Sequence, residues 1–318
     1  AAAIGGSKKC IDTSVNYANE RQQFGRPISK YGAIRYKISE QIIKTYSAES
    51  AAYRAGQNID DAIAALRASG MNHSEAELKG VEQFAIECAM LKVYGSEVLD
   101  YVVDEGVQIY GGMGYSAEAP MDRAYRDARI NRIFEGTNEI NRMLTVDMIL
   151  RRAMKGEIDL MTPAMQVAGE LMSIPEPFED DGTLFCAHKE YLRKFKKAIL
   201  MVAGSAVQKL MQSLAKEQEI LMDIADMAID TYVAESTMLR VEKIAKMRGQ
   251  ENCEVLIDIV NVLFNDMADR IYVKGKNAIN SFADGDEQRM MIMGLKRFTK
   301  TEPFNVKEAR RRIAALAI

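Results

Sequence analysis

The chain has 318 residues, with 42 Lys and Arg against 45 Asp and Glu, so its formal net charge is −3. This balance excludes a protein that binds nucleic acid through a strongly basic surface. Hydrophobic residues at 48% and charged residues at 27% are ordinary globular values, which exclude general disorder, and the length suggests about two domains.

Apolar residues recur at helical spacing through the first half of the chain, and no sustained period-two alternation predicts a strand. Ser74 and Glu77 have the spacing of a capping box at a helix start. Cys88 shares a helical stripe with apolar residues, which predicts a core position. Helices are predicted over 3–22, 31–68, 74–108 and 137–154, with a short charged segment over 119–133.

The second half repeats this helical layout after an interruption. Two prolines, an acidic run and a glycine over 174–182 indicate a loop or linker. Asp223, Asp226 and Asp230 are predicted to form the polar face of a helix whose other face is apolar. The predicted fold is all-α, with two consecutive helical bundles joined by a linker: 1–154, 155–184 and 185–318.

The sequence has few residues that could bind a metal or form disulfides. The four cysteines are far apart, and the two histidines form no ligand cluster, so no metal site is predicted and a reducing compartment is the simpler interpretation. His188 is expected at the surface or in packing. No uninterrupted apolar run approaches the roughly 18 residues that a membrane-spanning helix needs.

The segment 122–140 is the most unusual part of the chain. Arginines at every third position over 123–132 form one helical face, and a solvated, salt-bridged helix is the simpler explanation. Glu135 follows Ile133 and Phe134 and precedes a predicted N-cap, Thr137. Partial burial there would suit a general base, although a glutamate favoured by the helix macrodipole is the better interpretation from physics alone.

Three motifs, in this order, resemble signatures of the acyl-CoA dehydrogenase family. Residues 16–25 are similar to YxxERxxFG, and residues 108–115 are similar to QxxGGxGY. Residues 126–130 and 134–140 are similar to RDARI followed by YEGTNEI. The resemblance covers about residues 1–150, the C-terminal helical bundle of that family. The remainder resembles, less specifically, the extra C-terminal helical domain of the very-long-chain branch.

The resemblance implies a role for Glu135. It matches the catalytic base, which removes a proton from the carbon alpha to an acyl-CoA thioester while a hydride leaves the beta carbon for the flavin of FAD. The product is a trans-2-enoyl-CoA. The thioester oxygen needs hydrogen-bond donors in such a reaction, and the Glu135 N–H is the donor implied here.

Other positions match cofactor and substrate contacts of the family. Phe134, where the family commonly has Tyr, and Gly136 lie beside the base, and Arg142 matches an arginine near the adenine end of a ligand. Gly112 would allow close approach of the backbone, although a helix C-cap glycine is an equal alternative. The positions implied in FAD binding are Arg21, Phe24, Gln108 and Gly112 for the neighbouring subunit, and Thr137 and Glu139 for the same subunit.

The resemblance also implies a setting. The chain lacks the helical and β domains that precede this segment in the family, so we expect a C-terminal fragment that is inactive alone. Expected partners are the acyl-CoA substrate, an electron-transfer flavoprotein as acceptor and a second copy in a homodimer, with no nucleic acid. The basic helix over 193–202 suggests either peripheral membrane contact or, more simply, packing.

The expected location is cytoplasmic or membrane-associated in a bacterium and on the matrix side of a mitochondrion in a eukaryote. An alternative from another functional class stays open, namely a non-catalytic scaffold or assembly partner of the same family.

Overall fold

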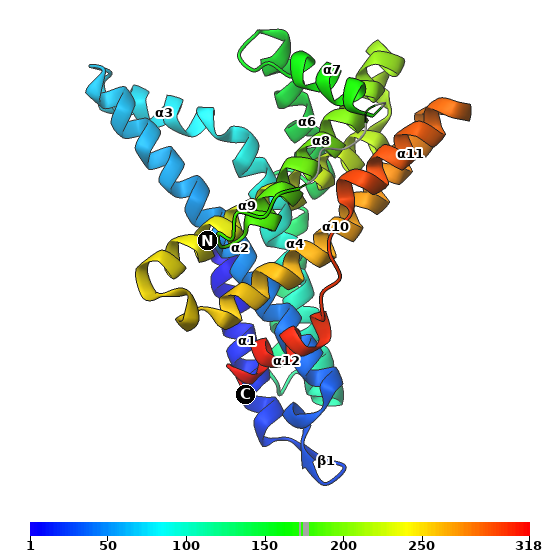
Figure 1. Cartoon of the computed structure of the whole chain (residues 1–318). Coiled ribbons are helices and arrows are strands. Elements are labelled where there is room, and N and C mark those ends of the chain that lie inside the picture. The colour runs from blue at the N-terminus through cyan, green and yellow to red at the C-terminus, as the bar shows by residue number, and fades with distance from the viewer. Residues whose placement is uncertain (172, 174–177) are drawn as a thin grey trace.

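The computed structural model describes residues 1–171, 173 and 178–318. These residues are almost entirely helical, which confirms the all-α prediction (Figure 1). The α-helices are α1 Ala2–Glu20, α2 Gly32–Ala68, α3 His73–Gln83, α4 Ala85–Tyr110, α5 Met121–Arg129, α6 Asn138–Met154, α7 Met161–Glu170, α8 Cys186–Leu210, α9 Gln218–Arg248, α10 Glu254–Phe282, α11 Gly285–Thr299 and α12 Val306–Ala315.

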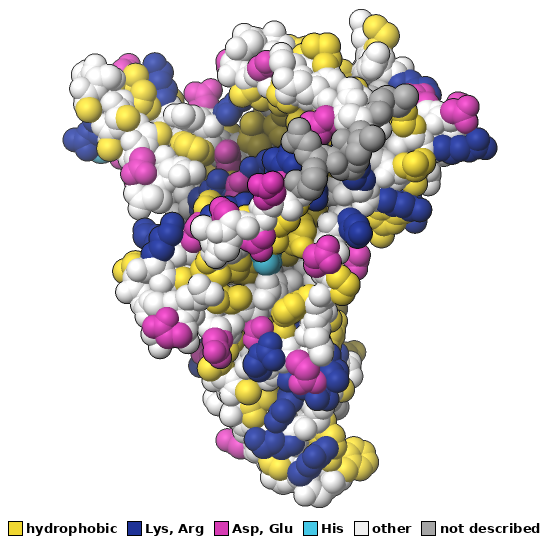
Figure 2. Space-filling view, viewed as in Figure 1, with side chains coloured by type: hydrophobic (Ala, Val, Ile, Leu, Met, Phe, Trp, Pro, Cys, Tyr) yellow, Lys and Arg dark blue, Asp and Glu magenta, His cyan; other side chains and the backbone are white. Residues whose placement is uncertain are grey.

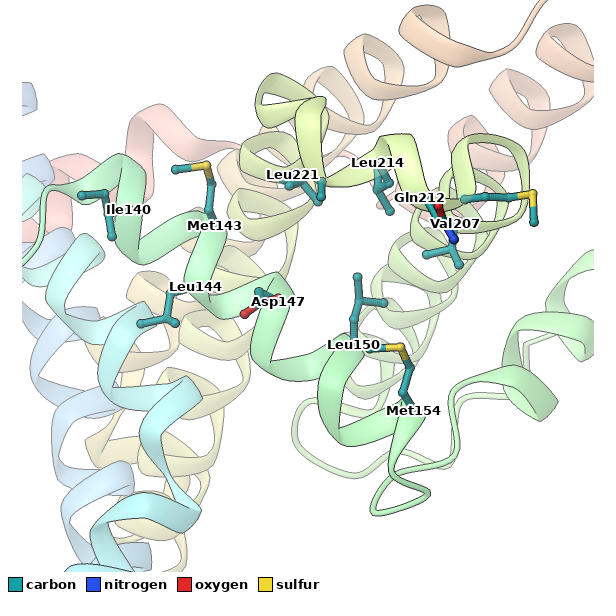
Figure 3. A pocket seen from close by; sticks show the side chains of 12 residues that line it. Ile140, Met143, Leu144, Asp147, Leu150, Met154, Val207, Gln212, Leu214 and Leu221 are labelled. Atoms are coloured by element: carbon teal, nitrogen blue, oxygen red, sulfur yellow. The ribbon is translucent and has the colours of Figure 1, made fainter.

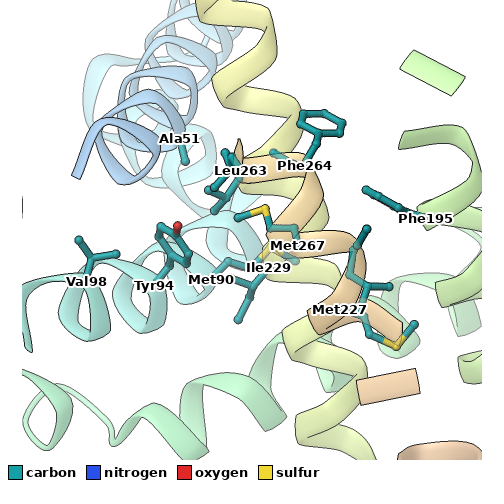
Figure 4. Packing of buried hydrophobic residues seen from close by; sticks show 14 of the residues in the cluster. Ala51, Met90, Tyr94, Val98, Phe195, Met227, Ile229, Leu263, Phe264 and Met267 are labelled. Carbon is teal, nitrogen blue, oxygen red and sulfur yellow. The ribbon is translucent and has the colours of Figure 1, made fainter. Parts of the chain in front are cut away.

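Helix α4 is the centre of the first bundle and packs against α1, α2, α5 and α6. Its buried face carries Met90, Tyr94 and Val98, and Figure 4 shows Met90 and Tyr94 beside residues of α9 and α10. Gly111 ends α4 with a φ of +60°, a backbone conformation that disfavours residues with a Cβ. The C-cap glycine is therefore Gly111, and the C-cap alternative considered for Gly112 is wrong.

The two bundles share a continuous apolar core. Helix α9 packs against α2, α6, α8 and α10, and α12 returns from the C-terminal end to pack against α2. His188 lies between aromatic rings, 5.2 Å from Phe185 and 4.8 Å from Phe264 by ring centroids. Burial lowers its pKa to about 4, so it is a neutral packing residue at physiological pH, as expected.

The predicted helix over 74–108 is two helices. The helix is interrupted at Phe84, which is both the C-cap of α3 and the N-cap of α4. The N-cap of α3 is Asn72 instead of Ser74. The Asn72 side chain accepts a hydrogen bond from Glu75 N at 2.9 Å. Helix α3 turns back along the projecting half of α2 (Figure 1), where a Cβ on Gly80 would come within 2.4 Å of Ile63 Cγ1.

The core position expected of Cys88 is wrong, because its side chain is exposed. Ile86, Met90 and Val93 form the buried face of α4, and Cys88 lies on a different face of the helix. Apolar residues on several sides of this helix hid the correct face from a periodicity argument.

A two-stranded hairpin follows α1, although no strand was expected. Strand β1 (Gln22–Gln23) pairs antiparallel with β2 (Arg26–Pro27). The turn needs positive φ at both central residues, +51° at Phe24 and +85° at Gly25. The hairpin forms the lower tip of the molecule in Figure 1.

The segment expected to be a linker, 155–184, contains helix α7, which packs against α8. The predicted loop over 174–182 lies partly outside the described residues, and its described part, 178–182, is irregular. Among the described residues, one stretch, Cys186–Lys216, is long and apolar enough to cross a membrane by length and composition. It comprises α8 and the 3₁₀ helix η4 (Met211–Lys216), and α8 buries Phe195 and Val202 in the shared core.

The aspartates of α9 do not form the solvated face that the sequence predicts. Helices surround α9, so Asp230 is only 1% exposed. An Arg270 nitrogen lies 2.8 Å from Asp230 Oδ1 without hydrogen-bond geometry, and within the described part of the chain neither carboxylate oxygen has a donor. Burial raises the pKa of Asp230 to about 6, because the charged form is poorly solvated.

We expect Asp230→Asn to stabilise the fold at alkaline pH. The raised pKa makes the ionised carboxylate a cost that appears as pH rises through about 6 and is absent below the unfolded pKa. Two pKa units correspond to about 3 kcal/mol as an upper bound on the gain near pH 8. Urea unfolding of both chains should show this gain shrinking near pH 4.5. A variant less stable than the parent near pH 8 would contradict the assignment.

Candidate functional site

The loop before α6 has an uncommon backbone. Glu135 and Gly136 both adopt left-handed conformations, with φ of +55° and +82°. For a glutamate this conformation costs about 1–2 kcal/mol, so it persists only where the surroundings hold it. Thr137 is the N-cap of α6, as predicted, and its Oγ1 accepts a hydrogen bond from Ile140 N at 3.4 Å.

Polar side chains from α4 and α6 hold this loop. The carbonyl oxygen of Gly136 accepts hydrogen bonds from Lys92 Nζ at 2.6 Å and from Asn141 Nδ2 at 2.8 Å. Lys92 Nζ also donates to Asn138 Oδ1 at 2.8 Å, and Asn138 Nδ2 donates to Ser96 Oγ at 3.0 Å. Because Asn138 is 2% exposed, this network is buried beneath the turn.

The side chain of Glu135 is exposed in this chain, so the partial burial that would suit a general base is not found. Its neighbours Ile133 and Phe134 are also nearly half exposed. The pKa of Glu139 is lowered, first by a hydrogen bond from its own backbone N–H and then by one from the Thr137 hydroxyl. The loop and the first turn of α6 therefore present the carboxylates of Glu135 and Glu139 at one exposed edge.

Arg142 lies one turn further along α6, and acidic side chains surround its guanidinium. Nε lies 2.7 Å from Asp226 Oδ1 of α9, and Nη1 lies 2.7 Å from Glu97 Oε1 of α4. Lys274 of α10 lies 2.8 Å from the other Asp226 oxygen. Although burial opposes the charge, Glu97 and Asp226 raise the pKa of Arg142 overall. These contacts join three helices, and the ligand role implied for Arg142 stays a prediction.

The four positions implied in binding the neighbour's FAD lie together at the lower tip of the molecule, at the other end of α4 from Lys92. Arg21 caps the C-terminus of α1, and Phe24 forms the hairpin tip with its side chain 92% exposed. Gln108 is exposed on the last turn of α4, and Gly112 lies in the 3₁₀ helix η2 (Gly111–Tyr115). Figure 2 shows Lys and Arg side chains beside hydrophobic ones at this lower tip.

The two groups of residues do not meet within one chain. Lys92 contacts the Glu135 loop, and Gln108 is 16 residues further along the same helix. At 1.5 Å per residue, about 24 Å of helix separates them. The assignment of the lower group to the FAD of a neighbouring subunit stays a prediction.

An apolar groove of about 780 Å³ opens beside α6 (Figure 3). Ile140, Met143 and Leu150 line it from α6, and residues from the end of α8, from η4 and from Leu221 of α9 face them. Asp147 and Gln212 are its polar lining residues. The sequence analysis missed this groove, because the pattern of α6 does not tell which apolar side another helix covers.

Sequence analysis also missed the residues that shape the turns. Lys92 stands among buried apolar residues of α4, and a lone charge in such a run is a signal that could have found it. Gly114 follows the GG pair, and a Cβ there would lie 2.5 Å from the carbonyl oxygen of Val107. This close approach explains the second glycine of the Gly112-Met-Gly114 turn.

Comparison with known proteins points to one family. Residues 1–150 match a family model described as acyl-CoA dehydrogenase, C-terminal domain, and residues 194–297 match a second model of the same description. A probable acyl-CoA dehydrogenase of Bacillus subtilis (strain 168) is 38% identical over 312 residues, 98% of this chain and 52% of the relative. The mitochondrial very long-chain specific acyl-CoA dehydrogenase of Macaca fascicularis is 30% identical, over 76% of this chain and 37% of the relative.

A solved structure agrees in detail. The acyl-CoA dehydrogenase of Bacillus anthracis, complexed with FAD, superposes with a TM-score of 0.94 at 41% identity and covers 99% of this chain and 53% of that one. The chain thus spans about half the length of the first relatives it matches. The chain therefore belongs to the acyl-CoA dehydrogenase family.

Proposed function

We propose that this chain forms the catalytic helical part of an FAD-dependent acyl-CoA dehydrogenase, with Glu135 as the base. The observation that carries the proposal is the turn at Glu135, where a strained, buttressed backbone presents an exposed carboxylate at the start of α6. Strain of this kind is concentrated at functional sites, and the turn lies within the motif that matches the family.

The chemistry follows from two groups of the same residue. The Glu135 carboxylate would remove the proton alpha to the thioester carbonyl, forming an enolate-like transition state. In the described part of the chain the Glu135 N–H has no acceptor, so it is free to donate to the thioester oxygen as negative charge develops there. The bound FAD would accept the hydride that leaves the beta carbon.

The residues at the lower tip fit a flavin dinucleotide. Arg21 is exposed beside the hairpin, and a guanidinium gives paired donors to pyrophosphate oxygens. The Phe24 ring is open to solvent at the tip, and nothing lies within 4 Å of a Cβ built on Gly112. We therefore propose that Arg21, Phe24, Gln108 and Gly112 hold the FAD of a partner copy in a homodimer. Thr137 and Glu139 would lie near the chain's own FAD.

The electron acceptor proposed for the reduced flavin is an electron-transfer flavoprotein, as the family resemblance implies. A non-catalytic scaffold, the alternative function, would not require a glutamate with a strained backbone at position 135. The buttressing of this turn by Lys92 and Asn141 supports the enzyme over the scaffold.

The test is anaerobic flavin reduction in the full-length protein. We expect the purified protein to carry a flavin spectrum that bleaches when a fatty acyl-CoA is added. The 318 residues alone should neither retain flavin nor turn over substrate, since they span about half of their relatives. A full-length protein without flavin, or one whose flavin no fatty acyl-CoA reduces, would overturn the proposal.

A further inference from the structure

We propose that Lys92 is a positioning residue that sets the direction of the Glu135 carboxylate by holding the Gly136 carbonyl. This inference rests on the proposed role of Glu135 as the base. Lys92 lies on α4, 43 positions before Glu135 in the sequence, and its ammonium reaches the loop across the interface between α4 and α6.

The geometry of the carbonyl is the first argument. A carbonyl oxygen can accept two hydrogen bonds, and Gly136 O has two donors, Lys92 Nζ at 2.6 Å and Asn141 Nδ2 at 2.8 Å. The Lys92 bond is charge-assisted and therefore the stronger of the two. Together they fix the peptide between Gly136 and Thr137, and so they hold the left-handed backbone of Gly136, the residue next to Glu135.

The burial of the network is the second argument. Asn138 is only 2% exposed. Its side-chain oxygen accepts a hydrogen bond from Lys92 Nζ, and its side-chain nitrogen donates one to Ser96 Oγ. This orients the amide and holds the ammonium at a fixed place between two acceptors. Burial lowers the pKa of Lys92, while the nearby charges of Glu135, Glu139 and Glu97 oppose that shift. A half-buried cation with three carboxylates around it therefore remains the donor to the turn.

Among the described residues, the donor to the Gly136 carbonyl besides Lys92 is Asn141. Gly136 has a φ of +82°, and a Cβ there would lie 3.0 Å from Asn141 Nδ2, so the residue cannot be replaced without disturbing the second donor. Loss of the Lys92 ammonium would leave the partly buried Gly136 carbonyl with one donor and let the two left-handed residues relax. The Glu135 carboxylate would then be displaced from a reacting carbon.

Lys92→Met tests the proposal in the FAD-loaded full-length protein. A displacement of the order of 1 Å lowers kcat by about a hundredfold, and because substrate binding is not the role assigned, KM should change by less than about threefold. Lys92→Arg, which keeps a cationic donor, should recover part of the lost kcat. Lys37→Met is the matched control, because Lys37 of α2 pairs with Glu105 of α4, away from the loop, and this variant should keep kcat unchanged.

A second readout separates positioning from folding and does not depend on turnover. In the 318-residue chain, Lys92→Met should shift the Gly136 amide resonance and speed its hydrogen exchange, while core amides of α10 keep their parental shifts. Unchanged Gly136 shifts together with unchanged kcat would overturn the positioning role and leave Glu135 as the base. Loss of turnover in Glu135→Gln is a separate requirement, so the two proposals fail independently. General loss of core resonances in Lys92→Met and Lys92→Arg alike would reduce Lys92 to a structural residue and refute the proposal.

Discussion

Replacing Glu135 by glutamine should lower the turnover of the full-length enzyme by about 10³-fold to 10⁴-fold, the range that a positioned base contributes. Glutamine keeps the size of the side chain and the backbone N–H, but it cannot accept the alpha proton. The left-handed turn at Glu135 and the network beneath it should be unchanged, because Lys92 contacts the backbone of Gly136. Stopped-flow bleaching of the flavin under anaerobic conditions measures this step directly.

The control for this experiment is Glu82→Gln, an equal change on the exposed α3. We expect it to retain parental turnover. Both variants should keep the flavin spectrum and the thermal unfolding midpoint of the parent. If Glu135→Gln turns over within about tenfold of the parent, the general base lies elsewhere, since one tenfold change is only 1.4 kcal/mol of barrier.

Arg142→Met should destabilise the fold by about 2–3 kcal/mol, which is below the usual cost of breaking a fully buried pair. The guanidinium side chain is 15% exposed and joins Glu97 of α4 to Asp226 of α9. Its removal leaves two carboxylates with fewer partners, although Lys274 still lies 2.8 Å from Asp226 and Glu97 is partly solvated. Urea unfolding of the 318-residue chain measures the loss.

The matched control is Arg151→Met on the same helix. Arg151 pairs with Asp147 on the surface, where both side chains are half exposed or more, so its loss should cost less than about 1 kcal/mol. Equal stability of Arg142→Met and the parent would contradict the joining role. A large rise in KM for acyl-CoA without loss of stability would instead favour the ligand role implied by the sequence.

Long helices were the part of the fold that could be predicted. Gly70 and the glycine pair after α4 end helices where the sequence places the ends, because both endings need positive φ. The break at Phe84 could not be predicted, since neither proline nor glycine marks it. It depends on where α3 leaves α4 to follow α2, and that path is set by packing between segments distant in sequence.

The sequence predicted that each helix exists better than it predicted which helices pack against it. Asp226 and Asp230 occupy a face of α9 that a single amphipathic helix would expose, but both are buried because α2, α4, α6, α8 and α10 pack around α9. The periodicity of a sequence reports one apolar face and does not report how many neighbours a helix has. The same limit placed Cys88 inside and left the groove beside α6 undetected.

The candidate site was found by its motif and could be understood only from its geometry. The sequence places Glu135 before an N-cap, and Thr137 fills that role. It does not reveal that Glu135 is left-handed, nor that Lys92 of another helix holds the next carbonyl. Such contacts join residues 44 positions apart, which no local pattern encodes.

Exchange of the alpha proton tests the role of Glu135 apart from flavin reduction. In heavy water, the full-length enzyme with bound FAD should place deuterium at the alpha carbon of a 3-thia-acyl-CoA, whose sulfur blocks hydride loss from the beta position. Mass spectrometry should find this exchange in the parent and in Glu82→Gln, and none above the solvent rate in Glu135→Gln. Exchange at the parental rate in Glu135→Gln would show that another group removes the proton.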